Sequence, residues 1–443
     1  MTKMYVKPAI EKLSAGFMNT YGLMADTAIA VRRDIDGVSI DDLCQQFGSP
    51  LFVYSENRLR HAIRNMKNTF ANHYPNVVTA WSYKTNYLQG ICGVFHEEGA
   101  LAEVVSAMEY DRARALGIPG ENIIFNGPVK PLDALERAAK DGALIHIDHM
   151  DEIDDLESVA QAHNLTIKVG IRINLDAGIY PQWSRFGFNL ESDQALEAVR
   201  RIHVGGRLQL SSLHCHIGTY ILDPAAYGRQ TEKMVRFAKH IESTFGFLIE
   251  TIDIGGGFPS SARLKNSYLP PDVSVPAMDE YASAISTSLL EGFPAGRFPR
   301  LVLEAGRALV DDAGFLITTI AASRRLMDGS RAYVVDAGLH VLFTSFWYKH
   351  GLEIDRPITG ITEKSAIYGS LCMNIDVLEE SVMLPPLPRG ARFIMSPVGA
   401  YNQTQSMQFI HYRPAAVMIT QAGEPKLICR KETLEDHLIR EAL

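Results

Sequence analysis

Lys84 ends an apolar run of the chain, VVTAWSYKTN at residues 77–86. Near-continuous apolar runs of this length are typical of buried strands, so the lysine is expected at the mouth of one. Partial desolvation there lowers the pKa of an amine and makes it nucleophilic toward a carbonyl group. Because lysines at strand ends also commonly extend to solvent, the run by itself only allows Schiff-base chemistry at Lys84.

Motifs downstream of Lys84 supply the other groups that a carbonyl cofactor needs. Gly255, Gly256 and Gly257, in DIGGGF, would let backbone N–H groups approach a phosphate closely. Glu304 follows the apolar run RLVL and could pair with a protonated pyridine nitrogen, which makes the ring a strong electron sink. The remaining motifs are HCHIGT at 214–219, EAGR at 304–307, LCMNID at 371–376 and GAY at 399–401. Together they predict a site for pyridoxal 5'-phosphate (PLP).

Size and composition agree with a two-domain enzyme. The 443 residues are many for one core, and 47% apolar with 21% charged residues is ordinary for a globular enzyme. The formal charge of −8 is spread without a basic stripe, which argues against nucleic acid as a partner. We expect neither a membrane span nor a signal peptide, because long uncharged apolar stretches are missing and the N-terminus is charged from its start.

The cysteines and histidines predict neither a disulfide framework nor a metal site. The five cysteines are scattered and form no CxxC pair, which indicates reduced thiols in a cytoplasmic protein. His214 and His216 could suggest a metal, but no further ligands lie near them in the sequence. We therefore expect no bound metal.

Eight apolar runs, each followed by a segment with helix spacing, predict the architecture of residues 55–310. The runs are VVTAWSY near 80, ALAEVVS near 103, NIIFNG near 124, ALIHID near 145, TIKVGIRIN near 170, LQLSSLHCH near 212, IETIDIGG near 253 and RLVLEAG near 303. Eight strand–helix units in about 250 residues indicate an α/β fold, a (β/α)8 barrel of the TIM type. A doubly wound open sheet is the structural alternative.

Residues 311–443 have a different pattern, with short apolar runs separated by turn residues and few helical segments. This pattern predicts a C-terminal antiparallel β domain, which residues 1–54 are expected to join. Lys84, His216, the three glycines and Glu304 all fall at or just after the ends of predicted barrel strands. Barrel active sites form at that face, with phosphate commonly held after the seventh and eighth strands.

The motifs and their order resemble those of the fold type III PLP-dependent decarboxylases, the group of diaminopimelate, ornithine and arginine decarboxylases with an alanine-racemase-like barrel. The resemblance covers roughly residues 45–425. WSYKTN is similar to the family's Y-A-x-K-A-N, which implies that Lys84 forms the Schiff base with PLP. HIGT is similar to H-I-G-S, which implies that His216 stacks on the cofactor ring and that Thr219 is a hydroxyl on the phosphate side.

Further residues take expected roles from the same resemblance. DIGGGF matches the phosphate loop, and EAGR resembles E-P-G-R, which implies that Glu304, Gly306 and Arg307 bind the cofactor and that Arg307 holds a carboxylate or phosphate. Cys372 aligns with a catalytic cysteine donated across a homodimer interface, and GAY places Tyr401 near the phosphate and the substrate. Smaller matches are GALAEVVSAMEY at 99–110, IRIN at 171–174 and SRFG at 184–187.

The departures from the family pattern concern the substrate. Met373 stands where diaminopimelate decarboxylases have a glutamate for the distal amine, and Thr344 stands where they have a distal arginine. Tyr348 is kept and is expected near the substrate, and Asp376 could replace part of the lost acid. Lys349 follows Tyr348 in place of an ornithine-decarboxylase aspartate, and it would favour an anionic or polar distal group if it faces the pocket rather than solvent. An unpaired buried ammonium is costly, so such a site is expected to bind a distal ammonium weakly.

The resulting expectation is a PLP-dependent carboxy-lyase acting on an amino acid with an anionic or polar distal group. Related enzymes of carboxylate siderophore pathways act on citrate-linked amino acids, and such a substrate would fit. A true diaminopimelate decarboxylase and a PLP-dependent racemase are the alternatives. An aldolase using Lys84 without PLP and a non-enzymatic regulator are the further alternatives.

Overall fold

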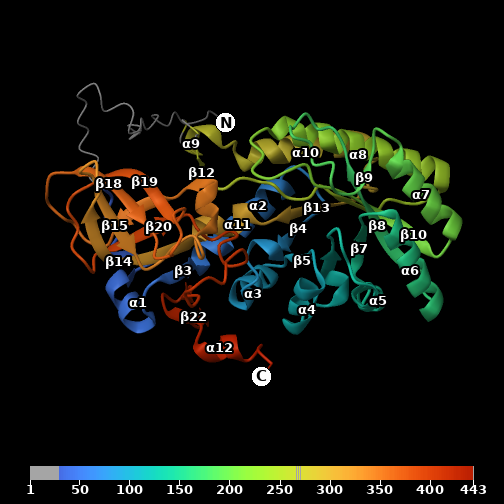
Figure 1. The fold of residues 1–443 in the computed structure, drawn as a ribbon. Coiled ribbons are helices and arrows are strands. Elements are labelled where there is room, and N and C mark those ends of the chain that lie inside the picture. Colours follow the sequence, from blue (N-terminus) through green and yellow to red (C-terminus); the bar gives the residue numbers. More distant parts are fainter. Residues whose placement is uncertain (1–28, 266, 268, 270, 443) are drawn as a thin grey trace.

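The computed structural model describes residues 29–265, 267, 269 and 271–442 (Figure 1). The expectations for a charged N-terminus without a signal peptide, and for residues 1–28 as part of the β domain, lie outside the described residues. No helix among the described residues is both long and apolar enough to cross a membrane.

Eight parallel strands form a closed barrel. They are β4 (Val77–Ser82), β5 (Leu101–Val104), β6 (Ile123–Phe125), β7 (Leu144–Ile147), β8 (Ile167–Asn174), β10 (Leu208–Cys215), β11 (Thr251–Asp253) and β13 (Arg300–Ala305). Neighbours pair in the order β10-β11-β13-β4-β5-β6-β7-β8, and β8 pairs with β10 to close the ring. Each of the eight predicted runs contains one barrel strand. The barrel prediction is therefore confirmed, and the open-sheet alternative is wrong.

Helices cover the outside of the barrel (Figure 1). They are α2 (Glu56–Ala71), α3 (Gln89–Glu97), α4 (Ala107–Ala115), α5 (Leu132–Lys140), α6 (Met150–His163), α7 (Gln194–Gly205), α8 (Pro224–Phe245) and α10 (Met278–Gly292). Local signals start several of them; Ser55 caps α2 and Ser106 caps α4 through side-chain oxygens that accept backbone N–H groups. The last barrel strand is followed only by the short α11 (Arg307–Val310), and α2, which precedes β4, packs against β4 in the eighth helix position.

A second domain is built on a separate sheet. Its strands are β3 (Leu51–Ser55), β14 (Gly314–Arg325), β15 (Arg331–Val335), β17 (Gly351–Ile354), β18 (Glu363–Tyr368), β19 (Val377–Leu384), β20 (Arg392–Ser396), β21 (Ala415–Ile419) and β22 (Pro425–Cys429). Most ladders are antiparallel, as predicted, whereas β3–β21 and β15–β18 are parallel. Figure 1 shows β3, in blue, among the orange and red strands of the C-terminal half. The bounds of 1–54, 55–310 and 311–443 stay a prediction.

Smaller elements connect or flank the two domains. They are β1 (Asp34–Ile35), β2 (Val38–Ser39), α1 (Ile40–Phe47), β9 (Phe188–Asn189), β12 (Arg263–Leu264), α9 (Pro271–Ser274), β16 (Tyr348–Lys349) and α12 (Leu434–Leu438). β12, in the loop after β11, pairs with β16 of the second domain. The Tyr401 N–H also donates to the carbonyl of Thr85 at 2.8 Å. These contacts hold the second domain against the carboxyl-end face of the barrel.

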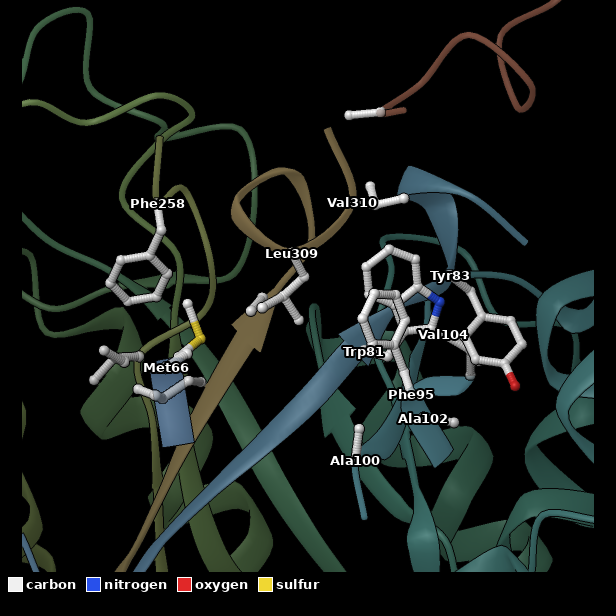
Figure 2. Close-up of a cluster of buried hydrophobic side chains, with 14 of the residues drawn as sticks. Met66, Trp81, Tyr83, Phe95, Ala100, Ala102, Val104, Phe258, Leu309 and Val310 are labelled. Atoms are coloured by element: carbon white, nitrogen blue, oxygen red, sulfur yellow. The ribbon is translucent and has the colours of Figure 1, made fainter. Parts of the chain in front are cut away.

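One continuous apolar core runs from the barrel into the second domain. Figure 2 shows a part of this core. In this view Leu309 lies between Phe258 and Met66 on one side and Trp81 and Phe95 on the other. The Trp81 and Phe95 rings pack with centroids 4.2 Å apart. Because this packing immediately underlies α11 and the turn after β4, it fixes the backbone that carries Arg307 and Lys84.

Candidate active site

A cavity of about 300 Å³ lies at the carboxyl ends of the barrel strands. It brings together most of the residues that the sequence singled out for a cofactor. Those that line it are Lys84, His216, Thr219, Gly256, Gly257, Glu304, Gly306, Arg307 and Tyr401. Gly255 is not among the lining residues, but it precedes Gly256 in the chain, and a Cβ on it would lie 2.7 Å from His216. Residues whose roles the sequence did not predict also line it, among them Asn126, Arg172, Trp183, Phe186 and His214.

Lys84 lies in a tight turn (Tyr83–Thr85) directly after β4 and pairs with a carboxylate. Its Nζ atom donates to Glu103 Oε1 at 3.0 Å and Oε2 at 2.7 Å. Burial by itself would lower the pKa of the Lys84 amine, but the Glu103 and Glu304 carboxylates outweigh burial and raise that pKa above its ordinary value. The expectation of a lowered pKa from desolvation is therefore wrong for this state, since two carboxylates face the same amine.

Glu304, at the end of β13, is held from two sides inside the barrel. Its Oε1 accepts a hydrogen bond from Asn126 Nδ2, and its Oε2 lies 3.3 Å from His214 Nε2. Asn126 follows β6, and its Nδ2 also donates to Glu103 Oε1 at 3.0 Å. One amide thus bridges the carboxylate beside Lys84 and the carboxylate predicted to face a pyridine nitrogen.

His216 follows β10 and presents an uncharged ring to the cavity. Burial, followed by the nearby Arg172 and Lys84 cations, lowers the pKa of His216 to about 3. The Gly256 N–H donates to its Nδ1 at 2.9 Å, so the ring hydrogen is on Nε2. Trp183 meets the ring edge to face, with centroids 5.1 Å apart. A neutral ring held in this way is a flat surface on which a cofactor ring can stack.

The glycine run after β11 is too closely approached to carry side chains. A Cβ atom on Gly256 would lie 2.2 Å from the carbonyl oxygen of Glu304, and one on Gly257 would lie 2.4 Å from that of Gly218. Gly255 and Gly257 also have φ values of +69° and +97°, which favour glycine. Gly306 is similar, since its Cβ would meet Thr85 Oγ1 at 2.2 Å. The space that these absent side chains leave forms a backbone cradle suited to a phosphate.

Arg307 is a buried cation whose donors are only partly used. Its Nη1 donates to Asp311 at 2.9 Å, and its guanidinium carbon lies 4.2 Å from the Tyr348 ring centroid and 5.1 Å from that of Tyr401. Its Nε is buried and makes no hydrogen bond to any residue that the structure describes. A clamped, partly unsatisfied guanidinium lining a cavity is a ready binding group for a carboxylate or phosphate.

The motif LCMNID at 371–376, which carries the cysteine expected to cross a dimer interface, does not line the cavity of its own chain. Cys372 is exposed, and Met373 packs against the core. Asp376 is buried, and its carboxylate accepts the N–H groups of Leu339 at 2.7 Å and Leu371 at 2.8 Å. These bonds give Asp376 a structural part in shaping the loop, and its expected contact with substrate stays a prediction.

The two neighbours Tyr348 and Lys349 have different surroundings. Tyr348 is buried beneath the Arg307 guanidinium and supports it from outside the cavity lining. Lys349 is exposed, and its Nζ lies 3.7 Å from a carboxylate oxygen of Glu379. The expected contact of Lys349 with a distal substrate group is therefore not made within its own chain. Thr344 is also buried and bonds to Asn402 Oδ1 at 2.9 Å.

Some site residues were not predicted, although the sequence carried signals for them. Asn126 directly follows a predicted strand, in NIIFNG, which is the position that identified Lys84 and His216. His146 and His214 are polar residues inside otherwise apolar strands, a pattern that indicates a polar barrel interior. With Glu304 they form a buried group whose ligand atoms lie within 4.8 Å of one another. Both nitrogens of His146 are already hydrogen-bonded, to Asn126 and Ser212, so this group does not fit a metal ion.

The donor set fits PLP in each of its parts. A lysine amine reaches the cavity, a glycine cradle lies at one side, a neutral imidazole offers a flat face, and a buried carboxylate lies deep in the barrel. The amine matches the aldehyde of PLP, and the glycine cradle matches its phosphate. The imidazole matches its aromatic ring, and the carboxylate matches its pyridine nitrogen.

Comparison with known proteins agrees with this site. A family model described as the pyridoxal-dependent decarboxylase, pyridoxal binding domain, matches residues 58–311, more than half of the chain. The diaminopimelate decarboxylase of Aquifex aeolicus is 30% identical over 423 residues, which are 92% of this chain and 95% of that protein. The diaminopimelate decarboxylase of Bacillus subtilis is 27% identical over 91% of this chain and 93% of its own.

Solved structures give the same result for the fold. A crystal structure from Aquifex aeolicus superposes with a TM-score of 0.81 at 26% identity, covering 94% of this chain and 97% of that one. Diaminopimelate decarboxylase from M. jannaschii in complex with L-lysine superposes with a TM-score of 0.84 at 24% identity, covering 94% and 98%. Barrel and site together define a PLP-dependent carboxy-lyase. The chain belongs to the pyridoxal-dependent decarboxylase family, as the sequence motifs predicted.

Proposed function

We propose that the protein removes the α-carboxylate of an amino acid whose distal end is carboxylated or otherwise polar, such as a citrate-linked amino acid of siderophore biosynthesis. The observation that carries the proposal is the charge of the cavity wall. Among the described residues that line it, the only carboxylates are Glu103 and Glu304, and the cations are Lys84, Arg172 and Arg307. Both carboxylates already have partners, so neither is free to bind a distal ammonium.

The proposal gives separate roles to the residues that line the cavity. Lys84 would supply the amine for the cofactor aldehyde, the glycines would hold the phosphate, and His216 and Glu304 would hold the ring. When bound, PLP accepts the electrons that the departing carboxylate leaves behind. Arg307 binds an anionic group of the substrate, and its clamp between two tyrosines limits how far that group can move. Orientation and electrostatics of this kind supply much of a decarboxylase's rate.

The proposal includes a homodimer with shared sites. Cys372 is exposed in its own chain and lies outside its own cavity, as expected for a residue that serves a neighbouring subunit. In that position its thiol, or a water that it orients, would return a proton to Cα after carbon dioxide leaves.

Diaminopimelate decarboxylation is the second candidate, and the relatives favour it. Two relatives that match over nine-tenths of the chain carry that name. Its substrate has a distal carboxylate, which Arg307 could bind, and a distal ammonium, for which the described cavity residues offer no free acid.

A mass-spectrometric screen for loss of carbon dioxide tests both candidates. The holoenzyme is incubated with citrate conjugates of diamino acids, meso-diaminopimelate, lysine and ornithine, and Lys84→Ala is the inactive control. We expect turnover of a carboxylated substrate and little of ornithine or lysine. Efficient turnover of meso-diaminopimelate alone would replace the first candidate by the second. An amino acid whose chirality changes while its mass does not would indicate a racemase instead.

A further inference from the structure

A chain of hydrogen bonds continues from Asn126 into the barrel interior, below the cavity. Asn126 Oδ1 lies 2.7 Å from Nδ1 of His146, which is on β7. The Nε2 atom of the same ring lies 2.8 Å from Oγ of Ser212, on β10. His146, Asn126 and Ser212 are all buried, so each of these groups depends on its neighbours for hydrogen bonds.

The contacts of Asn126 determine its orientation. Its Nδ2 faces two carboxylates, those of Glu103 and Glu304, and supplies one hydrogen to each. The flipped amide would set an oxygen against both carboxylates and leave Glu304 Oε1 without a donor among the described residues. The Oδ1 atom must therefore face His146, and because an amide oxygen only accepts, His146 Nδ1 must carry a hydrogen.

The ring of His146 is uncharged and locked in place. Burial, followed by the neighbouring His214, lowers the pKa of His146 well below its ordinary value. Its Nε2 therefore accepts the Ser212 hydroxyl hydrogen. The ring also stacks on His214 with centroids 4.9 Å apart and planes 11° apart. Gly170 on β8 makes room for it, because a Cβ there would lie 2.2 Å from His146 Cδ2.

We propose that His146 is a positioning residue for the cofactor, acting through Asn126. Its Nδ1–H holds the amide so that one side chain donates at once to Glu103, the partner of Lys84, and to Glu304, the carboxylate facing the pyridine nitrogen. The attachment point of the cofactor and the anchor of its ring are thereby tied to each other. The role follows from the family's cofactor and does not depend on which substrate the enzyme takes.

Spectroscopy of the holoenzyme tests this role without any substrate. In His146→Leu the amide loses the donor that orients it, and Glu103 and Glu304 lose a hydrogen-bond donor. Less neutralised carboxylates stabilise a neighbouring cation more strongly, so the pH midpoint of the visible cofactor band should move up by about one unit. PLP retention after dialysis should weaken roughly tenfold.

Two further variants separate positioning from general destabilisation. His146→Asn puts an amide donor near the place of Nδ1 and should restore most of the midpoint and of the PLP retention. Ile145→Ala removes a buried side chain from the preceding position of the same strand, on the opposite face. It should lower the melting temperature without moving the midpoint. An unchanged or lowered midpoint in His146→Leu, no rescue by His146→Asn, or an equal shift in Ile145→Ala would overturn the proposal.

Discussion

The amine of Lys84 and the carboxylate of Glu103 are joined by two hydrogen bonds, of 3.0 and 2.7 Å. The pair connects adjacent barrel strands, because Lys84 follows β4 and Glu103 is on β5. Glu103 therefore keeps the free amine charged and aimed into the cavity until a cofactor arrives. This arrangement replaces the simple desolvation that a lysine at a strand end suggests.

Replacing Glu103 by glutamine should lower the pKa of the Lys84 amine. The carboxylate stabilises the ammonium, so its loss shifts the amine toward the neutral form and increases its reactivity near neutral pH. Reductive methylation of the apoprotein across a pH series, read by peptide mass spectrometry, measures the effect. The exposed Lys239 is the internal reference. Equal Lys84 reactivity in both proteins would mean that Glu304 alone holds the charge.

Alanine at Gly256 should weaken PLP binding. The added methyl would lie 2.2 Å from the Glu304 carbonyl oxygen, so the loop must move, at a cost of ~1–3 kcal/mol or roughly five- to a hundredfold in affinity. Equilibrium titration of the apoenzyme with PLP measures the loss. Gly93→Ala is the matched control, because Gly93 lies in α3 with open space around its Cβ position. A similar change in both variants would contradict a phosphate cradle at Gly256.

Replacing Arg307 by lysine should impair the binding and turnover of substrate more than the binding of the cofactor. An ammonium cannot reproduce the planar clamp between Tyr348 and Tyr401, and losing a charged hydrogen bond costs ~1.5–3 kcal/mol, roughly ten- to a hundredfold in kcat/KM. The visible cofactor band should remain. Arg263→Lys changes an arginine outside the cavity, which bonds to the Ser267 carbonyl, and is the control. If Arg307→Lys instead loses PLP, then Arg307 serves the phosphate.

Two inactive variants should restore activity to each other. Lys84→Ala removes the amine of one site and Cys372→Ala removes the exposed thiol, so a mixed dimer would contain one intact site. Subunits are exchanged, confirmed as mixed by mass tags, and assayed for release of carbon dioxide. Recovery approaching half the activity of an intact subunit pair is expected from the mixed fraction. Full exchange without recovery would place both groups in the site of a single chain.

Acid should destabilise the protein through His350. Burial lowers the pKa of this histidine to about 4 from an ordinary 6.5. Between these pH values His350 is therefore mostly protonated in the unfolded chain and mostly neutral in the folded chain. Stability therefore falls as pH falls through this window, by about 1.4 kcal/mol per pH unit for one such group. His350→Asn should reduce the slope by about that amount in denaturant unfolding at pH 6.5, 5.5 and 4.5. Parallel slopes would contradict the assignment.

The barrel, and the gathering of most predicted cofactor residues around one cavity, followed from the sequence for a shared physical reason. A strand buried on both faces is a near-continuous apolar run, and the polar residue that ends it marks the functional face, as at Lys84, His216 and Glu304. Interactions between strands gave no such local signal. The bridge from Asn126 to two carboxylates joins residues distant in the chain, and its geometry depends on barrel closure.

The distal pocket was least predictable for a related reason. The sequence left open whether Lys349 faces substrate or solvent. A strand points successive side chains in opposite directions, and β16 buries Tyr348 while leaving Lys349 exposed. Asp376 could replace part of the lost acid by its residue type, and nothing in the sequence indicated that its carboxylate binds backbone N–H groups of its own loop. For both residues the side-chain type indicated what chemistry was possible. Where each side chain lies was decided by the alternation of faces along a strand and by the hydrogen bonds of a loop, which the side-chain type does not reveal.

The parallel ladder between β3 and β21 also bears on how the molecule is made. β3 leaves the ribosome before the whole barrel, and β21 leaves it only after the barrel and most of the second sheet. A nascent chain therefore carries β3 with one open hydrogen-bonding edge through most of its synthesis, even once β14 has covered the other. Synthesis arrested before Ala415 would leave a complete set of barrel strands attached to a sheet with an unpaired edge at β3, which is a site where other chains can pair and aggregate until β21 covers it.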